Sequence, residues 1–208
     1  MRFTGFGDGA VEFYDGLLAD NSKAYWTDQR AVYEEHVRAP MAALLAELEP
    51  EFGAGKIFRP YRDVRFAKDK SPYKTHCGGF APPYYVQVGP DGLLAAAGYY
   101  GMAPDQLARF RTAVDDERRG EELVALLADC GLTVGGEQLR TRPKGADPAH
   151  PRLDLLRRKG LMVSRRWAPD DVLHERTCLD RVRRTWRAGR PLAEWLAEHV
   201  GPTEQPRR

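Results

Sequence analysis

Residues 58–76 read FRPYRDVRFAKDKSPYKTH, and this basic stretch is the most informative part of the sequence. Six Lys or Arg side chains and two Asp side chains give it a net charge of +4. The rings of Tyr61, Phe66 and Tyr73 lie between these charges, and His76 ends the run. Such crowding is typical either of a preorganised anion site or of a salt-bridged edge strand with solvated charges. We favour the anion site.

The first half of the stretch predicts a strand over residues 57–66. Phe58, Val64 and Phe66 alternate with charged residues, as in a strand that buries one face. Pro60 lacks an N–H group, so the strand is expected to begin at a sheet edge or at a bulge. On its polar face, Asp63 is expected to fix neighbouring guanidinium groups by hydrogen bonds rather than to act as a base.

The second half predicts a turn at Ser71-Pro72, after the alternation ends. Lys68, Lys70 and Lys74 would then lie on a loop at the end of the strand. These are three of only seven Lys residues, in a chain that otherwise uses Arg for positive charge. Their clustering favours sites that need a compact ammonium group with an adjustable pKa.

Periodicity predicts an α+β fold, with a mixed or antiparallel sheet packed against several helices and a C-terminal helical segment. Ser22 is the expected N-cap of a long helix that Pro40 kinks or restarts, and GPDG at residues 89–92 is a hairpin signal. The expected helices are 10–19, 22–48, 104–114, 121–130, 151–160, 170–187 and 192–200, and the expected strands are 57–66, 83–88, 93–100, 135–142 and 161–164.

Length predicts one domain over residues 1–200, followed by a flexible tail at 201–208. The three cysteines are widely spaced, which favours a reducing cytoplasm over a disulfide framework. No signal peptide and no apolar run long enough for a membrane helix are recognisable, so we expect no membrane partner. The sequence does not predict an oligomeric state.

Charge is segregated, although the whole chain carries only +2. Residues 1–57 and 77–139 each carry −5, whereas residues 58–76 carry +4 and residues 140–190 carry +9. Two basic blocks that meet in space would produce a focused positive field. Lys144 and His150, in the second block, lie just before a predicted helix that begins at Pro151 and would offer free N–H groups to an anion. For His150, ligand contact and helix capping are equally good interpretations.

The predicted ligand-binding residues share a positive charge, a ring or a hydrogen-bonding group. They are Arg59, Tyr61, Arg62, Asp63, Arg65, Lys68, Lys70, Tyr73, Lys74, His76, Lys144 and His150. Within this set we expect Arg62, Arg65, Lys68 and Lys74 to line a concave site with Tyr61 or Tyr73.

The sequence assigns no catalytic residue, and it leaves open whether the protein is an enzyme. Asp63, His76 and His150 are acid–base candidates whose geometry the sequence cannot give. Cys77 is expected to be a small buried residue rather than a partner of His76, because neighbouring side chains on a strand point to opposite faces. The spacing of His, Cys, Asp and Glu predicts no metal site, and the glycine pairs match no phosphate or dinucleotide loop, so we expect no cofactor.

Three stretches resemble the signature of the bacterial and fungal family numbered 2461 among domains of unknown function. They are residues 58–76, NSKAYWTDQRAVY at 21–33 and RPKGADPAHPRLDLLRRKGL at 142–161, and together they cover much of residues 3–165. The resemblance implies a soluble α+β protein and no established reaction. Ala67 stands where the family pattern usually has Ser, and Thr27 stands where a second aromatic residue is usual.

Three functions remain open at this stage. The first is a basic Arg/Lys/Tyr pocket for a phosphorylated or carboxylated small molecule. The second is a nucleic-acid-binding protein that uses the basic blocks 58–76 and 140–190. The third is a scaffold for an acidic protein. The acidic blocks oppose an extended nucleic-acid track, so the pocket ranks first.

Overall fold

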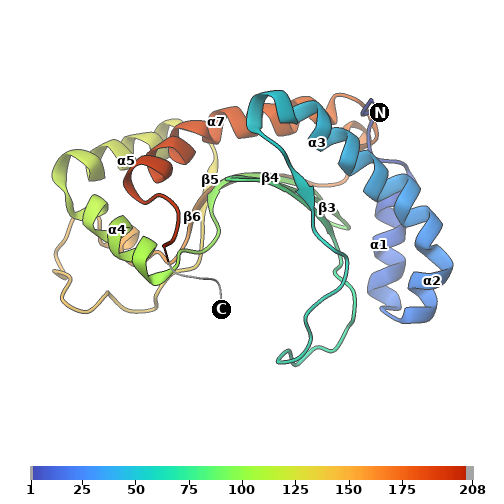
Figure 1. Cartoon of the computed structure of the whole chain (residues 1–208), viewed down its shortest axis with the longest axis horizontal. Coiled ribbons are helices and arrows are strands. Elements are labelled where there is room, and N and C mark those ends of the chain that lie inside the picture. The colour runs from blue at the N-terminus through green and yellow to red at the C-terminus, as the bar shows by residue number, and fades with distance from the viewer. Residues whose placement is uncertain (1, 205–208) are drawn as a thin grey trace. The chain divides into compact units, whose positions relative to one another are not determined.

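The N-terminal part of the chain folds into helices. The computed structural model describes residues 2–204. It has α1 at Gly9–Ala19, α2 at Lys23–Val32 and α3 at Ala39–Phe52. Figure 1 shows α1 beside α2, with α3 following on from α2. Ser22 Oγ accepts a hydrogen bond from Tyr25 N at 3.1 Å, which confirms the predicted N-cap.

A π-helical turn, Tyr33–Arg38, joins α2 to α3. Pro40 lies in the first turn of α3, where the absence of an N–H leaves no helical hydrogen bond unmade. The predicted restart of the helix at this proline is therefore confirmed. On the inner side of this helical run, Tyr33, Val37, Met41, Leu44 and Leu48 are all buried.

The residues that the structure describes form a six-stranded sheet in the order β1-β2-β3-β4-β6-β5. The strands are β1 at Lys56–Ile57, β2 at Cys77–Ala81, β3 at Tyr84–Gly89, β4 at Gly92–Tyr99, β5 at Thr133–Gly135 and β6 at Leu161–Trp167. Pairs β1–β2, β2–β3 and β5–β6 are antiparallel. With its helices this sheet makes the protein α+β, as predicted, and the hairpin predicted at residues 89–92 is present.

Packing divides the chain into two compact units. Unit 1 comprises Met1–Ala95 and Arg166–Arg184, and unit 2 comprises Ala96–Arg165 and Thr185–Arg208. The divisions fall inside β4, inside β6 and inside the last helix, α7, at Cys178–His199. A single domain over residues 1–200 stays our proposal for how the protein folds and unfolds.

In unit 1, α3 packs against β2 where the sequence places a glycine. A Cβ atom added at Gly79 would lie 2.9 Å from Met41 Sδ, so glycine allows this approach without a shift of the Met41 side chain. The strand β2 was not predicted, because two consecutive glycines give it a weak strand signal.

Unit 2 contains α4 at Pro104–Asp115, α5 at Glu117–Asp129, α6 at Leu153–Leu156 and the second part of α7. A Cβ atom added at Gly189 of α7 would lie 2.5 Å from Ala97 Cβ of β4. The small side chains of β4 therefore accommodate a helix.

Several predicted elements need correction. No strand spans residues 57–66, because regular pairing ends at Ile57. The strand predicted at 135–142 is β5, which ends at Gly135, followed by a lone bridge between Gln138 and Arg158. The helix predicted at 151–160 is the single turn α6. The helices predicted at 170–187 and 192–200 are a 3₁₀ turn at Asp171–His174 followed by one continuous helix, α7.

The tail predicted at 201–208 is described only as far as residue 204. Within that part, Thr203 Oγ1 donates to Asp105 Oδ1 at 2.8 Å, and Glu204 N donates to Asp105 Oδ2 at 2.9 Å. These contacts hold the described part of the tail against α4. Residues 205–208 lie outside the described residues.

Candidate functional site

Residues 58–76, the basic loop, make a long excursion between β1 and β2. Figure 1 shows the excursion extending away from the sheet and returning to it. Only one bridge, between Tyr61 and Tyr73, joins its two arms among the described residues. Beside that bridge, Arg62 N donates to Pro72 O and Lys74 N donates to Pro60 O, both at 2.8 Å.

The predicted burial of one face of residues 57–66 is wrong. Phe66 is 96% exposed and Phe58 is 38% exposed. Pro60 cannot donate to a ladder, and the outer part of the excursion has neither a paired strand nor a covering helix. An alternating pattern cannot produce a half-buried strand without such a surface.

The root of the basic loop is fixed to the corner between α1 and α2. Asn21 Nδ2 donates to Tyr73 O at 3.1 Å, and Asn21 Oδ1 accepts from Tyr73 N at 3.0 Å. The ring of Tyr73 stacks on Trp26, with centroids 4.4 Å apart and planes 8° apart. Tyr61 packs beside both rings. Tyr73 and Trp26 are buried, so the two arms of the basic loop extend from a rigid base.

The outer half of the basic loop neutralises two of its own cations. Arg65 binds Asp63 through Nε–Oδ1 at 2.9 Å and Nη2–Oδ2 at 2.6 Å. These bonds lower the pKa of Asp63 to about 2. Arg62 pairs with Asp69, whose Oδ1 also accepts from Ser71 N at 2.9 Å. Asp63 therefore orients a guanidinium group, as predicted.

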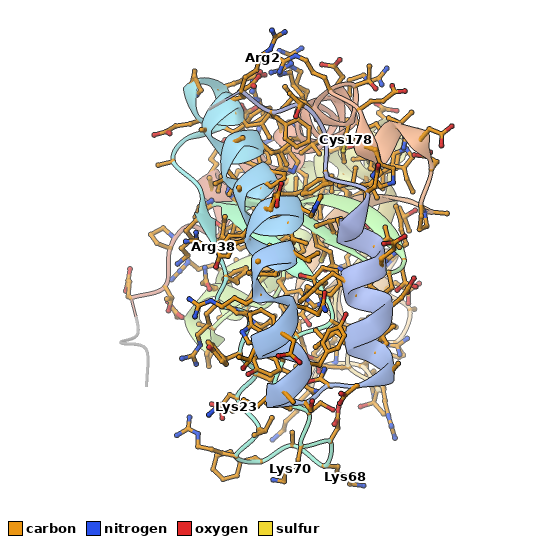
Figure 2. All side chains as sticks on the ribbon, turned by 90° about the vertical axis from the view of Figure 1, so that its right-hand side faces the viewer. Arg2, Lys23, Arg38, Lys68, Lys70 and Cys178 are labelled. Atoms are coloured by element: carbon orange, nitrogen blue, oxygen red, sulfur yellow. The ribbon has the colours of Figure 1, made fainter. Side chains whose placement is uncertain are left out.

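Lys68 and Lys70 lie at the far end of the basic loop, which Figure 2 shows at the opposite end of unit 1 from Arg2 and Cys178. Lys70 Nζ donates to Val64 O at 2.9 Å, a bond that leaves its charge uncompensated. Within residues 2–204, Lys68 forms neither an ion pair nor a side-chain hydrogen bond. Both ammonium groups are exposed.

Near the root lies a second group of cations, Arg59, Lys74 and His76, which we call the basal cluster. Lys74 Nζ donates to Arg59 O at 2.9 Å and lies 5.3 Å from the centroid of the Phe58 ring. Burial, and then the positive charge of Arg59, lower the pKa of Lys74. Burial, and then Lys74, lower the pKa of His76. In the part of the chain that the structure describes, no carboxylate forms an ion pair with this cluster.

Cys77 follows the basal cluster but takes no part in it. Its side chain is buried, and burial raises the pKa of the thiol to about 12. The prediction of a small buried residue is confirmed, since a thiol with this pKa is not a nucleophile near neutral pH.

Lys144 and His150, the predicted ligand-binding residues of the second basic block, belong to unit 2. Lys144 is exposed. His150 Nδ1 accepts from Arg152 N at 3.0 Å, and His150 Nε2 lies 3.3 Å from Asp115 Oδ1. The N-cap of α6 is Arg152 rather than His150, and α6 has no side-chain capping bond, so the capping interpretation is not borne out and ligand contact stays a prediction. That Lys144 and His150 lie close to the basic loop stays a prediction.

The prediction of free N–H groups after Pro151 is wrong. α6 is only four residues long, and its amides are already used. Leu153 N donates to His150 O at 3.1 Å, and Leu155 N donates to Arg152 O at 3.0 Å. This turn therefore does not present the N-terminus of a long helix to an anion.

Sequence reasoning missed the role of Asn21, which fixes the loop root. A single asparagine between two helices carries no signal for a partner 52 residues away. Phe58 was placed in a buried face but instead lies beneath the Lys74 ammonium group. Within residues 2–204, no three His, Cys, Asp or Glu side chains are grouped as metal ligands would be.

Comparison with known proteins gives one match. A family model described as "Conserved hypothetical protein (DUF2461)" matches residues 9–195. No curated protein and no solved structure matches the chain. None of the described helices is long and apolar enough to cross a membrane.

Proposed function

We propose that this chain, which belongs to the conserved hypothetical family DUF2461, binds the phosphate or carboxylate group of a small molecule at the basal cluster of its basic loop. One observation carries the proposal: the charge of Arg59 lowers the pKa of Lys74, the charge of Lys74 lowers the pKa of His76, and none of the three side chains is paired with a carboxylate in the described part of the chain. Like charges held together raise the free energy of the empty site. A bound anion would remove that cost.

The chemistry of the three side chains suits an oxyanion. A guanidinium group binds carboxylate or phosphate through two parallel hydrogen bonds, and an ammonium group adds a point charge. Lys74 is already held in place by Arg59 O, so less conformational entropy is lost when it binds a ligand. Arg62 and Arg65 are paired with Asp69 and Asp63, so they rank behind the basal cluster as anion ligands.

The proposal is limited to binding. His76 is the group of the cluster whose charge changes nearest to neutral pH, but the ring of His76 makes no hydrogen bond among residues 2–204. A reaction would need a second acid–base group close to it. Three free cysteines, Cys77, Cys130 and Cys178, favour a reducing, cytoplasmic location as part of the same proposal.

Replacing Lys74 with glutamine is expected to weaken phosphate binding about 10- to 100-fold, because a hydrogen bond to a charged group contributes about 1.5–3 kcal/mol. Inorganic phosphate above its dissociation constant should raise the melting temperature of the parent by about 2–4 °C for each kcal/mol that it adds to the free energy of unfolding. Lys56→Gln, which removes an exposed charge from β1, is the matched control and should retain the parental shift. Equal losses in both variants, or no shift in the parent, would contradict the proposal.

Sulfate binding is expected to strengthen as the pH falls from 7.5 to 5.5. The pKa of His76 is depressed in the folded protein, so protonating this group costs stability as the pH falls below its unfolded value of about 6.5. A bound anion offsets that cost and favours protonation. Sulfate stays a dianion over this range, so a larger thermal shift at pH 5.5 reports the protein.

His76→Asn is the control for the sulfate experiment. It removes the titrating group and should make the sulfate-induced shift nearly independent of pH, while the general stabilisation by excluded salt stays the same. A parent and a variant with the same pH dependence would exclude His76 from the site.

A further inference from the structure

Exposed aromatic rings follow one another along the basic loop. Phe58 is 38% exposed, Tyr61 is 52% exposed and Phe66 is 96% exposed. Exposed rings cost free energy in water, and a series of them on one segment marks an interaction surface. Tyr61 packs against Trp26 and Tyr73 at the loop root and is still half exposed. The proposed small-anion site uses neither Phe66 nor the exposed part of Tyr61, so this exposure needs another explanation.

Positive charges alternate with these rings. Arg62 and Arg65 separate Tyr61 from Phe66, and Lys68 and Lys70 follow Phe66. The two arginines are engaged by Asp69 and Asp63. Lys68 and Lys70 keep uncompensated charges at the end of the loop, where Figure 2 shows both of them. We call residues 61–70 the outer loop. It presents Phe66 and the two ammonium groups around a bend in the chain, with Tyr61 nearer the root.

We propose that this outer loop binds single-stranded nucleic acid, with Tyr61 and Phe66 stacking on bases and Lys68 and Lys70 contacting phosphates. Single strands alternate unpaired bases with charged phosphates, and proteins bind them with aromatic platforms and cations. Tyr61 and Phe66 are five residues apart, so an extended loop separates them by at most about 17 Å. A strand of a few nucleotides spans that distance.

The same observations disfavour two other partners. Burying one phenylalanine contributes about 1.5–3 kcal/mol, which is too little to anchor the protein to a membrane that meets the tip alone. Tyr61 packs against Trp26 at the root, away from the tip that a flat bilayer would contact. Duplex DNA keeps its bases stacked inside, and its grooves are read by helices or ribbons rather than by an irregular loop.

The surrounding charge limits the length of the contact. Residues 1–57, which supply the helices at the loop root, carry a net charge of −5. A strand that extended over these helices would be repelled. We therefore expect contact with about three phosphates, which for a single strand gives a log–log salt slope near −2.

The experiment is fluorescence anisotropy with a labelled twelve-nucleotide oligothymidylate, titrated between 50 and 200 mM NaCl. Phe66→Ala should weaken binding about 5- to 150-fold, because stacking on one ring contributes about 1–3 kcal/mol. Phe66→Trp should retain binding, whereas Phe66→Leu, which keeps an apolar side chain without a ring, should lose it. Lys68→Gln should make the salt slope shallower by about 0.7.

The proposal is overturned if the oligonucleotide does not bind, if Phe66→Ala binds like the parent, or if a blunt-ended duplex binds better. Binding to phosphatidylserine vesicles that Phe66→Leu preserves would replace it with a membrane contact. Phe66→Ala should keep the phosphate-induced thermal shift of the parent. That shift distinguishes failure of this proposal from failure of the basal anion site.

Discussion

Trp26→Ala is expected to lower the free energy of unfolding by about 3–5 kcal/mol, the range for truncation of a buried tryptophan or phenylalanine. Trp26 is 7% exposed and contacts four other rings, those of Phe13, Tyr33, Tyr61 and Tyr73. Its loss would leave a cavity between α2 and the root of the basic loop. Urea denaturation followed by circular dichroism measures the change.

The effect on the loop separates this prediction from a general loss of core packing. Without the stack on Trp26, Tyr73 keeps its hydrogen bonds to Asn21 and its contact with Tyr61 but loses its most closely stacked ring. Limited proteolysis at Arg62 and Arg65 should then speed up under conditions in which the protein stays folded. Leu44→Ala in α3, which is equally buried but away from the loop, should lower stability without this acceleration. Equal cleavage rates in both variants would show that Trp26 does not anchor the loop.

Gly98→Ala is expected to lower the free energy of unfolding by about 3 kcal/mol or more. Gly98 has φ of +123°, and an added Cβ atom would lie 2.4 Å from Leu161 O and 2.8 Å from Met162 Cα. Strained backbone costs about 1–3 kcal/mol, and the clash with the backbone of β6 adds an overpacking cost of similar size. The strands β4 and β6 cannot separate at this point without losing their pairing.

A second glycine supplies the matched control for Gly98. Gly131 ends α5 with φ of +61°, and an added Cβ atom would have no neighbour within 4 Å. Gly131→Ala should therefore cost only the conformational strain, about 1–2 kcal/mol. Urea midpoints of the two variants, compared at constant m-value, test the difference. Equal destabilisation would mean that the approach of β4 to β6 relaxes without cost.

Local signals predicted much of the fold, because they act over a few residues. Such signals determine the local backbone conformation at the capping serine, at the proline in the first turn of α3 and at the turn of residues 89–92. The failures have a tertiary cause. The alternation in residues 57–66 assumed a covering surface that the fold does not provide. Helix α7 continues past Gly189 and Pro191 because each of its halves has a buried apolar face.

The candidate site was only partly readable from the sequence. Composition identified the basic loop, but it could not separate Arg62 and Arg65, which have internal partners, from Arg59, Lys74 and His76. That separation depends on which carboxylates the folded loop brings within reach. The two hydrogen bonds between Asn21 and Tyr73 join residues 21–33 to residues 58–76. These two stretches, which carry the family resemblance, therefore pack together in the fold.

The division of the chain between the two units has a consequence for synthesis. Unit 1 needs Arg166–Arg184 as well as the first 95 residues. Unit 1 can therefore be completed only after this later segment has been synthesised, although N-terminal segments generally fold first. A premature stop codon anywhere between positions 96 and 184 would leave both units incomplete, so no truncated product in that range is expected to accumulate in a folded form.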